Sequence, residues 1–241
     1  MYKGFYTLSS SMMTQNKDIN VISNNLTNVS TPGFKSDKMV SGTFKEELLS
    51  RTSNNSSRAL GASLGGTSMI TVPYETVTDF SQGSFQETGR TLDFAIAGEG
   101  FFKVEGENGP VYTRNGSFII GDNGYLGLKG FGRVLSNNEP IRLYTDNFNV
   151  GSDGTITDES GARMAKLSVV TFDNMDGFTK VGEGIFSANG EGKNEDAGIM
   201  WKYVETSNVD PISEMTEMLS SQRTLQSAAQ ILKIYDEISA K

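Results

Sequence analysis

Two heptad repeats, one at each end of the 241-residue chain, constrain its fold more than any other feature. In the first thirty residues apolar side chains recur at alternating steps of three and four, with Gln15 as a polar interruption. The apolar members are Phe5, Leu8, Met12, Ile19, Ile22, Leu26 and Val29. This spacing predicts one long helix with a coiled-coil seam. The stripe needs a partner, because an isolated amphipathic helix is marginally stable in water.

The last thirty residues repeat this pattern. Pro211 suits the first position of a helix that follows Asp210, and Ser221 is a polar member of the stripe. The other seam residues are Met218, Leu225, Ala228, Leu232 and Tyr235. We expect the two terminal helices to pair either with each other or with other copies of the chain. Two helices that close an ordinary domain against its own sheet would also be amphipathic, and periodicity alone leaves that alternative open.

Between the helices the chain consists of short alternating segments. "LDFAIAGEGFFKVE", "PVYTRNGSFII" and "AKLSVVTFD" are typical of strands, and Asp-Gly or Asn-Gly turns separate them. The polar, glycine- and serine-rich stretch at 50–66 indicates a mobile linker. We therefore predict an α+β fold class with four parts. These are an N-terminal coiled-coil helix over 1–33, an extended linker and bracing segment over 34–69, a central all-β domain over 70–200 and a C-terminal coiled-coil helix over 201–241.

Composition excludes several classes of function. The chain has no cysteine and no histidine, which removes thiol nucleophiles, imidazole bases and almost every zinc or copper site. Its net charge of -8 opposes binding to a phosphate backbone. Carboxylates such as Asp93, Glu99 and Glu105 alternate with apolar residues, as on a solvent-facing strand edge, so we assign no catalytic residue. We expect no enzymatic activity, cofactor, metal, nucleic acid or small-molecule substrate.

The N-terminal residues contain no apolar core of a cleavable signal peptide, and no run approaches the length of a membrane span. Residue patterns alone therefore predict a cytoplasmic protein.

The stretch "SNNLTNVSTPGFKSD", residues 23–37, closes the first helix in an unusual way. Asn24, Asn25 and Asn28 crowd its last turns, although asparagine favours caps and turns over helix interiors. We expect these amides to form hydrogen bonds to other subunits or to the β domain. Pro32 and Gly33 fit the two central positions of a type II turn, which predicts that the chain leaves the helix there.

Several of these motifs resemble those of flagellar axial proteins. "SNNLTNVSTPGFK" is similar to the N-terminal signature of that family, "LDFAIAGEGFFKV" and "YTRNGSF" to its middle motifs, and "VETSNVDPISEMTEMLSSQRTLQSAAQIL" to its C-terminal signature. The residues that carry the terminal signatures are Asn24, Asn25, Asn28, Pro32, Gly33, Phe34 and Lys35 at one end, and Ser207, Asn208, Val209, Gln222 and Arg223 at the other. The motifs follow one another in the family's order along nearly the whole chain.

The resemblance implies a structural subunit of the bacterial flagellar basal-body rod. Terminal helices would form a coiled-coil inner layer around an export channel, with the β domain outside. The chain would leave the cell through the flagellar type III export apparatus without a cleaved signal and reside in the extracytoplasmic basal body, which replaces the cytoplasmic prediction. The implied partners are other copies in a helical polymer, other rod proteins, the hook protein, the export apparatus and envelope bushing rings.

Length favours a rod protein over a hook protein, since the chain has room for one β domain. "YVETSNVD" and the insertion at 50–66 favour the distal-rod type, with the proximal-rod type and the hook proteins as alternatives. Thr27 departs from the family pattern, which usually has alanine there. A remote alternative is a secreted β-rich carbohydrate-binding protein or enzyme, which requires an aromatic-lined cleft, although Trp201 is the single tryptophan.

Overall fold

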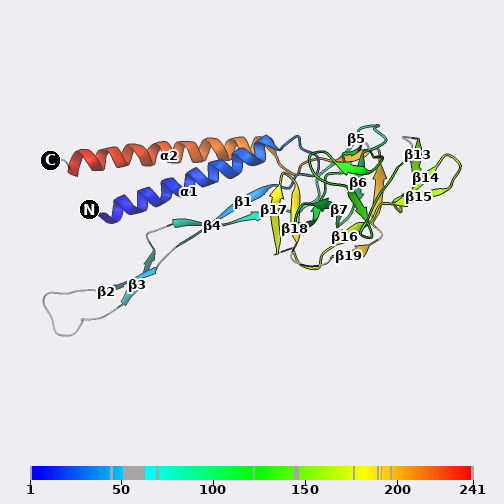
Figure 1. Cartoon of the computed structure of the whole chain (residues 1–241). Coiled ribbons are helices and arrows are strands. Elements are labelled where there is room, and N and C mark those ends of the chain that lie inside the picture. Colours follow the sequence, from blue (N-terminus) through cyan, green and yellow to red (C-terminus); the bar gives the residue numbers. More distant parts are fainter. Residues whose placement is uncertain are drawn as a thin grey trace. The chain divides into compact units, whose positions relative to one another are not determined.

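The structure is a computed structural model that divides the chain into two compact units (Figure 1). It describes residues 2–43, 46–50, 63–68, 71–121, 123–143, 147–175, 177–188, 190, 192–195 and 197–239. Residues 1–27, 37–79 and 210–241 make up the terminal unit, and residues 28–36 and 80–209 make up the central unit. An N-terminal helix, a β-rich middle and a C-terminal helix confirm the α+β class.

Both predicted helices are present in the terminal unit. Its elements are α1 (Tyr2–Thr27), β1 (Asp37–Thr43), β2 (Glu46–Ser50), β3 (Ser63–Ser68), β4 (Thr71–Thr78) and α2 (Pro211–Ser239). Asp210 caps α2, because its carboxylate accepts a hydrogen bond from the backbone N–H of Ile212 at 3.1 Å. Helix α1 ends at Thr27, so Val29, which we predicted as the last seam residue of the helix, lies in the turn that follows.

The two helices run antiparallel and contact each other at a constant register (Figure 1). Asn25 donates a hydrogen bond to the Glu214 carboxylate at 3.2 Å, and Ser221 donates one to the Asp18 carboxylate at 2.8 Å. Near the other end, Gly4 leaves room for the hydroxyl of Tyr235, which a Cβ atom on residue 4 would approach to 2.8 Å. Steps of seven or fourteen residues on α1 therefore match equal steps on α2.

Two antiparallel ribbons include β1, β2 and β3 from the segment that we predicted as an extended linker over 34–69, and β4 from the start of the predicted central β domain. Strands β1 and β4 pair from Asp37–Thr78 to Thr43–Thr71, with a bulge between Val40 and Ser41, and β2 pairs with β3. The bulge and Pro73 on β4 interrupt the period-two alternation, which explains why the sequence did not indicate these strands. Most of the predicted mobile stretch at 50–66 lies outside the described residues.

Short strands form the central unit, as the alternating segments predicted. They are β5 (Phe85–Glu87), β6 (Phe94–Ala97), β7 (Phe101–Gly106), β8 (Gly109–Thr113), β9 (Phe118–Ile120), β10 (Leu126–Leu128), β11 (Val134–Ser136), β12 (Glu139–Pro140), β13 (Phe148–Val150), β14 (Thr155–Asp158), β15 (Arg163–Lys166), β16 (Val169–Thr171), β17 (Phe178–Gly182), β18 (Ile185–Ala188), β19 (Lys193–Glu195), β20 (Gly198–Trp201) and β21 (Tyr203–Glu205). Among the described residues the largest sheet has eight strands, with β12-β11-β7-β8-β18-β17 in order, β16 paired with β7 and β19 paired with β16.

The core of the central unit lies on both faces of this sheet. On β7, Phe102 and Val104 point into the main cluster, which also contains Phe94 and Phe118. Phe101, their neighbour in sequence, points into a second cluster of aromatic side chains. Side chains alternate between the faces of a strand, so β7 contributes to both clusters at once.

A buried phenylalanine and an exposed one provide a matched test of this core. We expect Phe118→Ala, at a fully buried position, to lower the free energy of unfolding by about 3–5 kcal/mol. Phe131→Ala removes the same ring from a position that is 48% exposed and should have a much smaller effect. Urea denaturation followed by circular dichroism measures both, and equal losses would contradict the placement of the core.

Candidate functional site

The helix pair of the terminal unit carries the predicted seam residues of α2 on the side that faces α1. Ala228 is buried, and Met218, Leu225 and Leu232 are half-buried, in heptad register with the hydrogen-bonded Ser221. Tyr235, the last predicted member, is 39% exposed and extends toward Gly4. The α2 stripe is therefore occupied by α1 along most of its length within one chain.

On α1 the predicted stripe and the contact with α2 only partly coincide. Ile22 is buried and Leu8 is half-buried, on the side that faces α2. The contacts at positions 4, 18 and 25 show that small and polar residues complete this side. The remaining predicted members lie to one side of the contact and keep part of their surface exposed; they are Phe5, Met12, Ile19 and Leu26.

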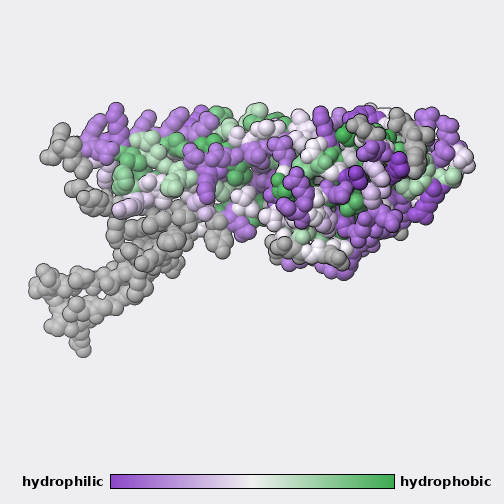
Figure 2. Space-filling view, in the orientation of Figure 1, coloured by the Kyte–Doolittle hydropathy of each residue, from purple (hydrophilic) through white to green (hydrophobic). Residues whose placement is uncertain are grey.

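Helix α2 carries further large apolar side chains that α1 does not cover. They form two groups, each with spacing i, i+3, i+7, that we call the first outer stripe (Ile212, Met215 and Leu219) and the second outer stripe (Ile231, Ile234 and Ile238). Exposure ranges from 45% to 76% among them. Figure 2 shows hydrophobic surface along the helices, rimmed by hydrophilic residues. Apolar surface of this extent on helices is typical of a protein–protein interface.

Hydrogen bonds of Asn25 hold the asparagine-rich end of α1 against other elements of the terminal unit. The buried amide of Asn25 accepts from the backbone N–H of Asp37 at 2.9 Å and donates to the backbone carbonyl of Asp37 at 2.8 Å. The same amide donates to Glu214, whose pKa is raised by burial, while the hydrogen bond from Asn25 opposes that rise. Among the described residues, the second oxygen of this carboxylate is buried without a hydrogen-bond partner. Asn25 thus links α1, β1 and α2, whereas Asn24 is exposed.

The turn that follows α1 has the predicted geometry. The backbone N–H of Phe34 donates to the carbonyl of Thr31 at 3.3 Å, and Gly33 has a φ of 68°, as the third position of a type II turn requires. Buried Asn28 supports the turn by accepting a hydrogen bond from the Thr31 hydroxyl at 3.1 Å. A Cβ atom on Gly33 would lie 2.3 Å from the backbone of Arg114, so glycine is also required for close packing.

A buried carboxylate joins the two terminal signatures in the central unit. Glu205 is fully buried and contacts Lys35 Nζ at 2.6 Å and Arg114 Nη1 at 3.2 Å. Its backbone carbonyl accepts from the N–H of Gly33 at 2.8 Å. Burial lowers the pKa of Arg114, and the paired Glu205 carboxylate opposes this shift. Sequence reasoning did not identify this cluster. The opposite charges of Lys35 in the N-terminal signature and Glu205 in the C-terminal one could have suggested that the two residues pair.

Asn208 and Ser207 of the C-terminal signature form further hydrogen bonds beside the Glu205 cluster. Asn208 accepts from the backbone N–H of Ser36 at 2.8 Å and donates to the hydroxyl of Ser81 at 3.0 Å. Ser207 accepts from the backbone N–H of Val209, which is itself buried. Gln222 and Arg223 lie on α2 and are exposed, so the structure does not bring them into this cluster.

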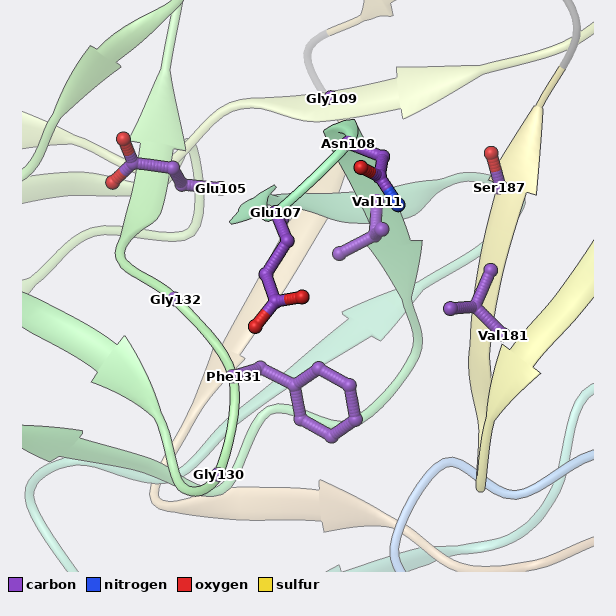
Figure 3. Close-up of a pocket in the computed structure, with 11 residues that line it drawn as sticks. Glu105, Glu107, Asn108, Gly109, Val111, Gly130, Phe131, Gly132, Val181 and Ser187 are labelled. Carbon is purple, nitrogen blue, oxygen red and sulfur yellow. The ribbon is translucent and has the colours of Figure 1, made fainter.

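A groove of about 720 Å³ lies on the central unit between the β7–β8 turn, the loop that contains Phe131 and strand β17 (Figure 3). Its one aromatic side chain, Phe131, points into the groove beside Glu107. The carboxylate of Glu105 points away from that of Glu107, so the two do not converge on a common site. Trp201 lies outside the groove, packs against Phe148 and donates its indole N–H to the Thr91 carbonyl. The described lining of the groove thus offers one ring, whereas the carbohydrate-binding alternative predicted an aromatic-lined cleft.

Two further observations concern metal ligands and membrane-spanning helices in the described part of the chain. The described residues contain no group of three or more acidic side chains placed to hold a metal ion. Among the described helices, none combines the length and the apolar character that crossing a membrane requires.

Three family models match the chain. "Flagella basal body rod protein" matches residues 5–35, "Flagellar hook protein FlgE/F/G D1 domain" matches 95–158 and "Flagellar basal body rod FlgEFG protein C-terminal" matches 202–241. The flagellar basal-body rod protein FlgG of Bacillus subtilis is 35% identical over 99% of this chain and 97% of its own length. FlgG of Buchnera aphidicola subsp. Schizaphis graminum is 30% identical, with 94% and 93% covered. FlgF of Caulobacter vibrioides is 29% identical, with 99% and 96% covered.

The close approach at the turn can be tested with two glycines of nearly equal φ. Gly33→Ala places a Cβ atom on a residue of positive φ and against the backbone of Arg114, and should reduce the free energy of unfolding by about 3 kcal/mol or more. Gly89 has a φ of 71° with nothing near its Cβ position, so Gly89→Ala should reduce it by only about 1 kcal/mol. Equal effects in chemical denaturation would show that the overlap is absent.

The buried carboxylate gives a second matched pair of substitutions. Glu205→Gln leaves two buried cations without a counter-charge and should destabilise the central unit by about 3–5 kcal/mol. Asp173→Asn makes the same chemical change in the exposed Lys193–Asp173 pair and should leave the denaturation midpoint unchanged. A Glu205→Gln variant as stable as the unmodified chain would contradict a structural role for the cluster.

Proposed function

The chain belongs to the family of flagellar basal-body rod proteins and is a structural subunit of that rod, and we propose that it polymerises into a hollow helical shaft around the export channel. The family is structural, which agrees with the expectation that the chain is not an enzyme. We further propose that the shaft transmits torque and that its terminal helices form the inner layer.

One observation carries this proposal, namely that the helix pair leaves much apolar surface exposed. Phe5 on α1 and the residues of both outer stripes on α2 are exposed in the single chain. Burial of apolar surface contributes roughly 25 cal/mol per Å² removed from water, so copies that cover these stripes would be held together strongly.

We propose that α1 and α2 pair as a coiled coil. The equal spacing of their contacts, at positions 4, 18 and 25 of α1 and 235, 221 and 214 of α2, supports a heptad register. The hydrogen bonds of Asp18 and Asn25 would fix that register, since a polar pair in an otherwise apolar contact penalises every shifted alignment. Phe5, Met12, Ile19 and Leu26 would then serve contacts between copies.

Further parts of the proposal rest on membership of the family. We infer that the chain is exported through the flagellar type III apparatus without a cleaved signal and is incorporated on the extracytoplasmic side. Other rod proteins, the hook protein and envelope bushing rings would be its partners. We favour the distal position in the rod, with the proximal position as the alternative, and assign the segment at 51–66 a bracing role between neighbouring copies.

A charge on the exposed flank of α1 tests the proposal. Leu26→Glu should abolish polymerisation of the purified chain, because it places a carboxylate on surface that other copies would bury. The β-rich central unit should stay folded, since Leu26 belongs to the terminal unit. Electron microscopy detects polymers, and circular dichroism verifies the fold.

The control for this experiment is Met13→Glu. Met13 is 68% exposed and lies about 140° around α1 from Leu26, outside the flank assigned to contacts between copies, so this variant should polymerise like the unmodified chain. Normal polymers of the Leu26→Glu variant would contradict the assignment of this surface.

A further inference from the structure

The exposed apolar residues of α2 change sides halfway along the helix. In the N-terminal half they form the first outer stripe, where the corresponding positions of the C-terminal half are polar, as at Gln226 and Lys233. In the C-terminal half they form the second outer stripe, where the N-terminal half is polar, as at Ser220 and Thr224. Outside the contact with α1, no one side of α2 is therefore apolar along its whole length, as a single straight partner helix would require.

Helical geometry places these stripes on the two outer sides of the helix pair. At about 100° per residue, the side that faces α1, the first outer stripe and the second outer stripe lie roughly a third of a turn apart around α2. Because both helices are right-handed and run antiparallel, the first outer stripe lies on the same side of the pair as Ile19 and Leu26 of α1. The second outer stripe lies on the other side. One chain thus presents two separate apolar surfaces.

We propose that the first outer stripe of one copy docks on the second outer stripe of the next copy, so that α2 alone contains both halves of a head-to-tail contact. This inference rests on the proposed function, because it names the partner of the surface that drives polymerisation. A contact between different surfaces repeats without closing, whereas a contact of one stripe with itself forms a two-fold dimer and stops.

A second copy fits these stripes better than an unrelated protein for two reasons. Both stripes consist of three large aliphatic side chains with the same i, i+3, i+7 spacing, so the ridges of one match the ridges of the other in length. Every copy also offers one stripe of each kind, so a head-to-tail array covers all of them except at its ends. Copies with parallel α2 helices would be displaced along the helix axis by the separation of Met215 and Ile234, about 30 Å.

Two variants that each lack one stripe test the proposal. Met215→Glu/Leu219→Glu removes the first stripe and Ile234→Glu/Ile238→Glu removes the second, at positions that are exposed in the single chain, so both variants should remain folded. Each should raise the concentration needed for self-association by about 100-fold or more. Because each variant keeps the stripe that the other lacks, an equimolar mixture should form a one-to-one dimer that grows no further. Sedimentation velocity resolves these species, and circular dichroism verifies folding.

The other outcomes overturn the proposal in distinguishable ways. A discrete dimer of either variant alone would show that one stripe binds itself. A mixture that stays monomeric, although the unmodified chain polymerises, would show that the stripes do not dock on each other, and the proposed function would stand. An unmodified chain that stays monomeric under all conditions would overturn the proposed function together with this inference.

Discussion

The ion pairs of the fully buried Glu205 carboxylate are the interactions on which the fold of the central unit depends. The carboxylate binds Lys35 in the segment that follows α1 and Arg114 in the middle of the central unit, and the backbone carbonyl of Glu205 accepts a hydrogen bond from the N–H of Gly33. Glu205 itself lies on β21, a few residues before α2 begins. A buried charge is stable only when it is paired, so these three distant parts of the chain must come together for the unit to fold.

The helix pair depends on a second set of polar contacts. Antiparallel packing requires that the end of α1 and the start of α2 lie close together, and the amide of Asn25 meets both Asp37 and Glu214 there. Asp18 and Ser221 repeat the connection one heptad further along. These hydrogen bonds specify the alignment of the helices within the chain, while larger apolar side chains remain on their outer sides. The alignment of the two helices within the chain and the proposed contacts between copies therefore use different faces of the same helices.

Much of this organisation could be predicted from the sequence, for physical reasons that differ between elements. Heptad spacing is a local signal, so α1 and α2 were predicted, and alternation identified strands such as β7. The residues of α1 that face α2 were predicted less well. Some of the large apolar residues in the heptad pattern contact α2, and the others lie beside the contact and stay partly exposed. Small and polar residues at positions 4, 18 and 25 allow the close approach, and an apolar pattern does not show them.

The remaining differences arise from contacts between residues far apart in the chain. Lys35, Arg114 and Glu205 form a cluster only after folding, and charge in a linear sequence does not say which residues pair. Strand β1 was predicted as part of a linker and β4 as part of the central β domain, because a bulge and a proline obscure the alternation that would identify them as a pair. Val29 was placed on the helix, but hydrogen bonds to Asn28 turn the chain immediately after Thr27.

The central claim is that the outer apolar stripes of the helix pair, exposed in the single chain, become buried between copies. Oxidation of Met215 by peroxide, followed by mass spectrometry of the monomer and of the polymer, measures this directly, since an exposed methionine is oxidised readily and a buried one is protected. We expect Met215 to react in the monomer and to be strongly protected in the polymer. Equal oxidation of Met215 in both forms would contradict the claim.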